Sequence, residues 1–318
     1  MAFKRTPLGL VLLASTIATL APSSAALPPA PLAATDPQAT EIALRTLAAI
    51  ERGWALDRYE QASRVRATIN LRGTNGLGVT GNVALDRPNR RWRLDTAGDV
   101  GPLTLYADAA RATLYVPALR QYASRVAGPL APGASVGREP TAELAAIRQR
   151  LEAGYAPLVY RGDETLGGAG VHVLQDTPEP GVTTTFWIDA RTSLPRRVAI
   201  AQAGGRETRL DFAYGSGARP TAVTATFPGT RAVRIVLTPS YDSTGRVSRL
   251  AIEGRMADGT GIDADLNVLW SARLGADYFR FAPPSGAQQV AFEQLASGVL
   301  FAAAAKLGPL VSIFLGTR

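Results

Sequence analysis

The chain has 318 residues, of which 46% are hydrophobic and 19% charged, with no cysteine, a single histidine (His172) and a formal charge of +8. The lack of cysteine excludes a disulfide scaffold, a thiol nucleophile, a cysteine-ligated metal and a lipid-modified N-terminal cysteine. With one histidine, no acidic ligand cluster and no G-x-S-x-G context, we predict no metal, no cofactor and no catalytic residues. The arginines are scattered rather than gathered in a basic module, so we predict no nucleic-acid binding; acidic partners or anionic lipid headgroups suit the charge equally well.

Residues 1–26 are predicted to be a cleaved signal peptide. The basic start MAFKR precedes the apolar run PLGLVLLASTIATLA and the small residues PSSAA, with cleavage after Ala25 or Ala26. A retained N-terminal anchor is the alternative, although the run is short for a membrane span. We therefore expect an exported, periplasmic protein whose residues 27–38, rich in proline and alanine, form a flexible lead-in.

Two long helices are predicted. The stretch DPQATEIALRTLAAIERG has Asp36 as its N-cap, Pro37 at its first position and Gly53 as its end. The stretch PTAELAAIRQRLEAG has Thr141 as its cap and Gly154 as its end. Both have apolar residues at helical spacing, so each is expected to bury one side.

The rest of the chain to about residue 274 has apolar residues at a period of two. Stretches such as RVRATINLRG and GIDADLNVLW alternate apolar and polar residues, and Gly, Pro, Asn and Asp separate them. This pattern is typical of an antiparallel meander that is buried on one face. We predict an α+β fold in one domain over residues 39–286, in which a large curved antiparallel sheet, or half-barrel, wraps around the helices.

The last segment, residues 287–318, is predicted to be an apolar C-terminal helix. It is almost wholly apolar, but Lys306, Gly308 and Pro309 make it a poor transmembrane helix. One reading is a helix buried against the sheet. The other is an amphipathic segment that touches a membrane or plugs a hydrophobic hollow, and the sequence leaves both open.

Five short hairpin motifs follow one another in order along the chain: Asp86-Arg87-Pro88-Asn89-Arg90 before Trp92-Arg93-Leu94, Leu103-Thr104-Leu105-Tyr106-Ala107-Asp108 with Ala112-Thr113-Leu114-Tyr115-Val116, Gly162-Asp163-Glu164-Thr165-Leu166-Gly167-Gly168 before Val171-His172-Val173-Leu174, WIDARTSLPRR from Trp187, and a closing strand and turn at Phe279-Arg280-Phe281-Ala282-Pro283-Pro284-Ser285-Gly286. Their order resembles that of the periplasmic lipoprotein-carrier (LolA/LolB-like) family. The same fold occurs in envelope-stress sensor domains. The resemblance implies a periplasmic location and acyl groups as cargo.

The chain also departs from that pattern. Ala109 stands where a glycine is usual, residues 219–268 add further strands, and the hydrophobic tail is extra. These departures leave the cargo open.

The hairpin TTTFWIDARTSLPRRVAI is expected to have structural duties. Alternation places Phe186 on one face of its strand and Trp187 on the other. Asp189 ends the strand, where its carboxylate can accept backbone N–H bonds and shape the turn. Pro195 suits the start of the next strand, and Arg196 is expected to solvate that start.

A half-closed sheet would leave a concave apolar hollow that suits acyl chains, because each buried CH₂ contributes about 0.8 kcal/mol. The predicted lining residues are those on the apolar phase of each strand; core packing is the favoured reading for any single one, and the prediction concerns the group: Trp92, Leu94, Leu103, Leu105, Phe186, Ile188, Leu210, Phe212, Ile235, Leu250, Ile252 and Trp270. Opening and closing of the hollow by the helices would be the mechanism.

The first hypothesis is thus an exported, non-enzymatic binding protein, a monomer, that holds a lipid or lipoprotein acyl group as a carrier or sensor. Its partners would be those acyl chains and an inner- or outer-membrane surface or receptor. The alternative is an envelope scaffold or partner-binding module whose hollow is plugged by its own C-terminal helix. A glycosidase using a carboxylate pair such as Asp163 and Glu164 has no sequence signature and stays a third reading.

Overall fold

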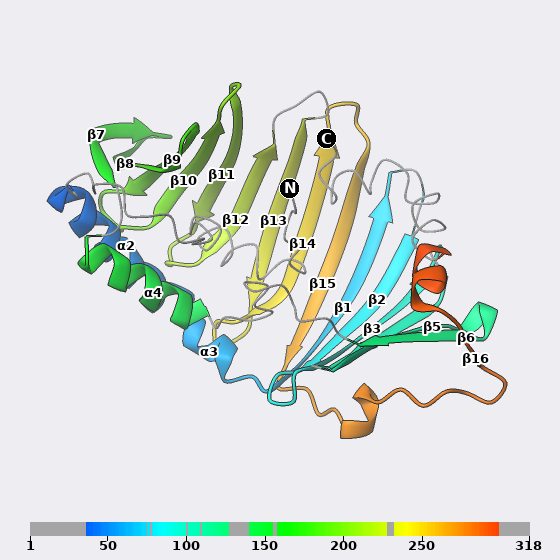
Figure 1. Cartoon of the computed structure of the whole chain (residues 1–318). Helices are drawn as coiled ribbons and strands as arrows, with labels where there is room; N and C mark the ends of the chain where they lie inside the picture. Colours follow the sequence, from blue (N-terminus) through cyan, green and yellow to red (C-terminus); the bar gives the residue numbers. More distant parts are fainter. Residues whose placement is uncertain are drawn as a thin grey trace. The chain divides into compact units, whose positions relative to one another are not determined.

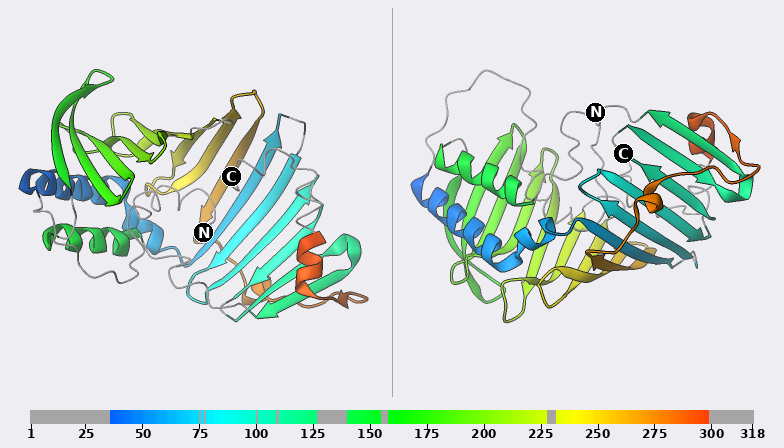
Figure 2. Two further views of the ribbon diagram at one scale, coloured as in Figure 1. Left: turned by 45° about the horizontal axis from the view of Figure 1, so that its top comes forward. Right: turned by 90° about the horizontal axis from the view of Figure 1, so that it is seen from below.

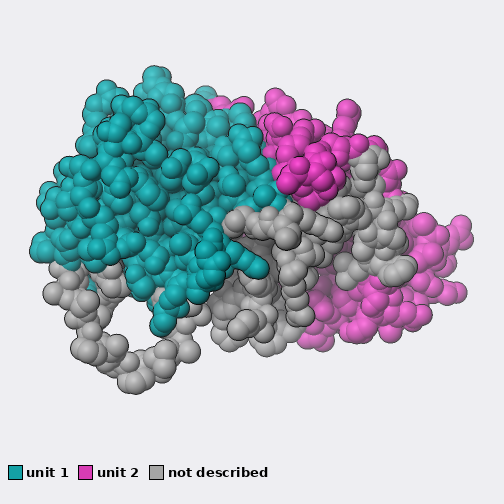
Figure 3. Space-filling view, turned by 90° about the horizontal axis from the view of Figure 1, so that it is seen from above, with its two compact units in different colours: residues 1–60, 132–239, 243–246 teal, residues 61–131, 240–242, 247–318 magenta. Residues whose placement is uncertain are grey.

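The computed structural model describes residues 36–74, 76, 78–99, 101–108, 110–126, 140–154, 158–227 and 232–298. The predicted signal peptide, most of the lead-in and the tail from residue 299 lie outside these residues. The chain divides into two compact units, coloured separately in Figure 3. Unit 1 comprises Met1–Glu60, Pro132–Pro239 and Ser243–Arg246, and unit 2 comprises Gln61–Ala131, Ser240–Asp242 and Val247–Arg318.

Unit 1 combines three helices with an antiparallel meander, whose strands neighbour one another in the order of the sequence (Figure 1). The helices are α2 (Pro37–Trp54), α3 (Leu56–Glu60) and α4 (Pro140–Glu152). The strands are β7 (Val159–Leu166), β8 (Ala169–Glu179), β9 (Val182–Asp189), β10 (Pro195–Gln202), β11 (Arg206–Tyr214), β12 (Pro220–Phe227) and β13 (Val233–Tyr241), the last two residues of β13 being counted with unit 2.

Unit 2 is built almost entirely of strands, in the order β16-β6-β5-β4-β3-β2-β1-β15-β14. All of its described pairs are antiparallel except β16 with β6, and neither series of strands closes on itself. The elements are β1 (Arg64–Gly73), β2 (Gly78–Asp86), β3 (Arg91–Gly98), β4 (Leu103–Ala107), β5 (Arg111–Val116), η1 (Pro117–Leu119), β6 (Gln121–Val126), β14 (Val247–Met256), β15 (Gly261–Trp270), η2 (Ala276–Phe279) and β16 (Gln288–Gln289).

The start of α2 is as predicted, and its end is one residue later. Asp36 Oδ1 accepts hydrogen bonds from the backbone N–H groups of Gln38 (2.9 Å) and Ala39 (3.3 Å), which makes it the N-cap. The helix continues past Gly53 to Trp54 and ends at Ala55, which has a left-handed backbone. Gly53 is needed for a different reason: a Cβ there would lie 2.5 Å from the Cβ of Ala218.

Two other expectations differ from the structure, and one helix was not expected. Thr141 lies within α4, which begins at Pro140, so it is not the cap; Gly154 does follow the helix end, with a φ of 72°. The short helix α3 was not predicted. Residues 279–286 are not a closing strand, because η2 ends at Phe279 and the next strand is β16. Two prolines in succession, Pro283 and Pro284, remove the backbone donors that a strand would need.

Helices α2 and α4 lie along one face of the unit 1 sheet (Figure 2). Ile42, Leu47 and Ile50 of α2 and Leu144 and Leu151 of α4 are buried against strand residues in one hydrophobic cluster. Full burial of such a side chain stabilises the fold by about 1.5–3 kcal/mol, so this layer is the main core of unit 1.

The β9–β10 hairpin confirms the structural role predicted for Asp189, which is 3% exposed. Its Oδ1 accepts hydrogen bonds from the backbone of Arg191 (3.1 Å) and from the backbone and hydroxyl of Thr192 (2.8 and 3.0 Å). Its Oδ2 accepts two from Arg196 (2.9 and 2.7 Å). Arg196 therefore pairs with the turn carboxylate instead of only solvating the strand start.

Replacing Asp189 by asparagine should lower the free energy of unfolding by about 2 kcal/mol, because the Arg196 guanidinium loses its charged partner in a largely buried place. Burial works to raise the pKa of Asp189, but the hydrogen bonds from Arg196 and Thr192 outweigh it and hold the pKa below its ordinary value. A carboxyl whose pKa is lower in the folded state contributes stability above its unfolded pKa, and this is lost as the pH falls through the folded pKa.

Urea unfolding of the wild type and D189N should therefore differ at neutral pH and converge in acid. Asp108→Asn is the matched control, since Asp108 accepts only backbone N–H bonds in an exposed turn and asparagine can do the same. Equal losses in the two variants would contradict the role of the Arg196 pair.

Candidate ligand-binding face

The sheet of unit 2 has one apolar and one polar face. Successive residues of a strand point to opposite sides, and the pairing registers align these sides from strand to strand. One cross-strand row runs through Leu94, Leu105, Leu114 and Ala123, and continues from Leu94 in the other direction through Val83. We call the side with this row the apolar face; it comprises Val65, Ala67, Ile69, Leu71, Val79, Val83, Leu85, Trp92, Leu94, Leu103, Leu105, Leu114, Val116, Ala123, Leu250, Ile252, Ile262, Ala264, Leu266, Val268 and Trp270.

The opposite side of the same strands carries polar groups that bond to one another. Asp95 Oδ1 accepts hydrogen bonds from Thr104 (2.8 Å) and from Arg93 (3.0 and 3.1 Å). The hydroxyl oxygens of Thr113 and Ser124 lie 2.8 Å apart and form a hydrogen bond across β5 and β6. The contrast between the two sides shows that the alternation of the sequence is used to make an amphipathic sheet.

Seven of the twelve predicted lining residues lie together on the apolar face of unit 2: Trp92, Leu94, Leu103, Leu105, Leu250, Ile252 and Trp270. All but Leu250 are only half-buried. Val65, Leu85, Leu266 and Val268 belong to the same face and were not predicted, although the period-two alternation of their own strands would have identified them.

The other five, Phe186, Ile188, Leu210, Phe212 and Ile235, lie in unit 1. They share one side of the meander, along the row from Phe186 through Val198, Leu210 and Ala225 to Ile235. Phe186, Ile188 and Phe212 pack in the cluster formed with α2 and α4, and the rings of Trp54 and Phe212 lie 6.4 Å apart. Leu210 and Ile235 pack in a neighbouring cluster with Val198 and Ala225. In unit 1 the predicted lining residues thus belong to hydrophobic core clusters, one of them formed with the helices.

The segment after β15 crosses both faces of the unit 2 sheet. On the polar face the ring of Phe281 lies 5.1–5.7 Å from those of Tyr106, Tyr115 and Tyr122, on three neighbouring strands. The guanidinium of Arg93 stacks between the rings of Tyr106 (4.9 Å) and Tyr278 (4.5 Å). We call residues 276–298 the strap.

The strap then turns around the edge strand β6. Strand β16 pairs with β6 in parallel, and residues 292–298 are helical on the other side of the sheet. Leu295 is buried there against Leu114, Val116 and Ala123, with Leu103 and Leu105 beside it. Residues 292–298, which belong to the predicted C-terminal helical segment 287–318, thus cover the β4–β6 part of the apolar face. The prediction of helix from residue 287 is wrong at Gln288–Gln289, which form β16.

Other polar groups do not form a recognisable reaction centre among the residues that the structure describes. His172 Nδ1 lies 2.5 Å from Asp163 Oδ1, in a pair whose aspartate is exposed and whose histidine is half-buried. The hydrogen bonds from His172 and Tyr160 hold the pKa of Asp163 below its ordinary value. No group of three metal-binding side chains occurs in this part of the chain, and no described helix is long and apolar enough to span a bilayer.

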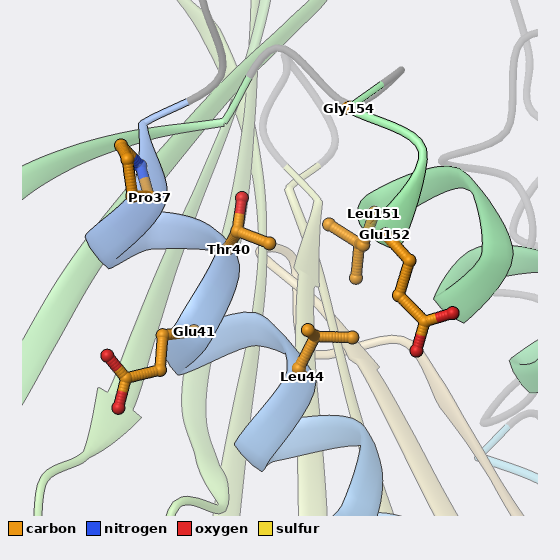
Figure 4. A pocket seen from close by; sticks show the side chains of 7 residues that line it. All are labelled: Pro37, Thr40, Glu41, Leu44, Leu151, Glu152 and Gly154. Atoms are coloured by element: carbon orange, nitrogen blue, oxygen red, sulfur yellow. The ribbon is translucent and has the colours of Figure 1, made fainter.

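A pocket of about 390 Å³ opens between α2 and α4 in unit 1 (Figure 4). Leu44 and Leu151 lie on opposite sides of it, and Glu41 and Glu152 stand at its rim. None of the twelve predicted lining residues borders it. It is therefore distinct from the predicted hollow.

Asp176 is a half-buried carboxyl on the side of β8 that faces the core, paired across the strands with Thr184. Its Oδ1 and the Thr184 hydroxyl are buried, and neither has a hydrogen-bond partner in the described structure. Burial raises the pKa of Asp176, while the backbone of Thr177 and the charge of Arg150 act in the opposite direction.

Asp176→Asn should raise the midpoint of thermal unfolding at neutral pH, because the amide needs no desolvation of a charge. The pKa of Asp176 is higher in the folded state, so the wild type should gain stability as the pH falls through that value, and D176N should lack this gain. Calorimetry across pH measures both effects. Asp211→Asn, which breaks ion pairs to Arg197 (2.5 Å) and Arg209 (3.0 Å), should shift the midpoint downward; a downward shift in both variants would contradict the prediction.

No protein-family profile matches the chain, and no curated protein matches its sequence. Solved structures do resemble it: a DUF1329 family protein from Desulfovibrio piger (15% identity, 80% of this chain and 100% of the other, TM-score 0.31) and a LolA superfamily protein from Nitrosomonas europaea (11%, 76% and 97%, 0.32). A domain from Vibrio parahaemolyticus assigned to outer-membrane lipoprotein sorting is similar as well (17%, 76% and 96%, 0.30). These likenesses concern the fold alone. The chain is thus similar to LolA-like structures, in keeping with the resemblance seen in its hairpin motifs.

Proposed function

We propose that this chain is an exported, non-enzymatic protein of the periplasm that binds the acyl group of a lipid or lipoprotein on the apolar face of unit 2, as a carrier or envelope sensor. The observation that carries the proposal is the face itself. It is continuous over β1–β5, β14 and β15, and most of its side chains are half-buried rather than enclosed.

The chemistry of the face fits an acyl chain. The row through Leu94 and the row that joins Ile69 to Leu266 carry aliphatic side chains, a glycine and one threonine (Thr96), and no charged group. The registers place the charged Arg125 on this side only at the edge strand β6, where its guanidinium lies over the ring of Phe292. Such a surface gains about 0.8 kcal/mol for each CH₂ that it removes from water, without a demand for a fixed orientation. A protein with such a surface distinguishes its ligands by the length and shape of their acyl chains, which suits the transfer or sensing of acylated cargo.

A second candidate rests on Leu295. Its burial on Leu114 and Ala123 shows that part of the apolar face is covered by the protein's own chain. If the residues that follow continue over the face, the protein is an envelope scaffold or partner-binding module, as the alternative reading of the sequence holds. The two candidates differ in whether the intact protein takes up an acyl ligand.

Val268→Glu should weaken binding of a fluorescent fatty acid to the mature protein at least tenfold, because it places a charge in the middle of the apolar face. Asn267→Glu is the matched control, since the adjacent residue of β15 lies on the polar face and should leave binding unchanged. Titration by fluorescence gives both affinities, and circular dichroism checks folding. Absence of fatty-acid binding by the wild type would overturn the proposal.

Deleting residues 291–318 separates the two candidates further. If the face is already open to an acyl chain, the truncated and intact proteins should bind an apolar dye with similar affinity. A large gain on truncation would favour the self-covered scaffold. Leu295→Asp in the intact chain provides a check without loss of residues, because it should detach the helical turn from Leu114 by burying a charge.

A further inference from the structure

One end of the unit 2 sheet carries a concentration of positive charge. The turn between β2 and β3 exposes Arg87 and Arg90, with Arg91 half-buried at the start of β3. Arg111, at the start of β5, and Arg273, just after β15, are exposed at the same end. The pairing registers place these turns at one end of the sheet. Asp86 pairs with Arg91 across β2 and β3, and Trp92 pairs with Ala107 across β3 and β4.

Two acidic residues at this end, Asp86 and Asp108, are engaged within the protein, and a third, the exposed Asp277, lies 3.7 Å from the exposed Arg280. Asp86 is 1% exposed, lies 3.6 Å from Arg64 and accepts a hydrogen bond from Asn89 (3.0 Å). Asp108 caps the β4–β5 turn by accepting backbone N–H bonds. The exposed charge of these turns is therefore predominantly positive.

The opposite end of the same sheet is different. Its described strand ends and connections carry Arg72 in β1, Asp99 after β3, Arg120 after η1 and Asp258 after β14. Two positive and two negative groups give this end no excess of positive charge. The basic character thus belongs to one end and is not spread evenly over unit 2.

Two of the four tryptophans of the chain mark the same end of the apolar face. Trp92 and Trp270 belong to one cross-strand row, through Leu85 and Val65, next to the terminal pair of Asp86 with Arg91. Both are half-buried, and the indole N–H of Trp270 donates to the backbone of Val247 (2.7 Å). Tryptophan at the end of an apolar surface, beside arginine, is the arrangement favoured at the headgroup level of a bilayer.

We propose that this arginine-rich end of unit 2 docks on the surface of an anionic lipid bilayer. Arg87 and Arg90 contact the phosphates, and Trp92 and Trp270 lie at the headgroup level, where the apolar face meets the membrane. An acyl chain can then pass between the bilayer and the face without crossing water. The inference rests on the proposed function for its purpose, but the docking itself is a separate property that can be measured alone.

The test is co-sedimentation of the mature protein with phosphatidylcholine vesicles that contain phosphatidylglycerol. We expect binding to these vesicles, weak binding to phosphatidylcholine alone, and release at high salt, because screening weakens contacts between exposed charges. The double variant R87Q/R90Q should bind at least tenfold more weakly, since each arginine near an anionic surface contributes about fivefold to the affinity.

The double variant R72Q/R120Q is the matched control. It removes the same charge from exposed residues near the opposite end, and Arg90 and Arg120 both have a φ near 50°, so any backbone effect is the same. The control should bind as the wild type does. Equal weakening in the two double variants, or no binding by the wild type, would overturn the proposal.

A second measurement uses the tryptophans. Brominated phosphatidylcholine in the anionic vesicles should quench part of the tryptophan fluorescence, and W92F/W270F should lose that quenching while Trp54 and Trp187 still report on unit 1. Quenching that persists in W92F/W270F would contradict the docking geometry. If docking and quenching behave as expected but fatty acids do not bind in solution, the proposed acyl-binding function fails and the docking stands.

Discussion

The strict alternation of side chains in the unit 2 sheet is the constraint on which its apolar and polar faces depend. A shift of any strand by one residue would move its apolar set to the polar side. Two kinds of contact hold the register. Turn carboxylates such as Asp86, with Asn89, and Asp108, with the backbone of Ala110, fix the hairpins locally. Cross-strand polar pairs such as Thr104 with Asp95 fix it between turns, because they would be separated by a slip.

Local features could be read from the sequence because local chemistry determines them. Asp36 before Pro37 marks the start of α2, and Asp189 with Pro195 marks a hairpin, whatever surrounds them. The strap could not be read in this way. Phe281 looks like an alternating strand residue, but its neighbours are tyrosines more than 150 residues earlier, and only the pairing of β4, β5 and β6 brings them together.

The candidate site shows the same limit more sharply. Phe186 and Leu94 occupy equivalent positions in alternating strands, and nothing in the sequence around them distinguishes their roles. The difference arises from what covers each face. In unit 1, α2 and α4 turn the apolar side into core around Phe186, whereas Leu94 remains half-buried on a face whose described cover lies over β4–β6. Binding surfaces and cores share one pattern, and the element that packs above them decides which is formed.

The strap also determines how the sheet meets its neighbours. An unpaired edge strand is a template for edge-to-edge aggregation. In unit 2, β16 occupies the backbone groups of β6 at Gln121 and Tyr122, and the parallel pairing brings the chain around that edge. In unit 1, the terminal strand β7 is broken by a bulge between Tyr160 and Gly162, where the glycine has a φ of 113°. The pairing with β16 protects the first residues of one edge strand and the bulge bends the other, and both features disfavour edge-to-edge pairing with a second chain.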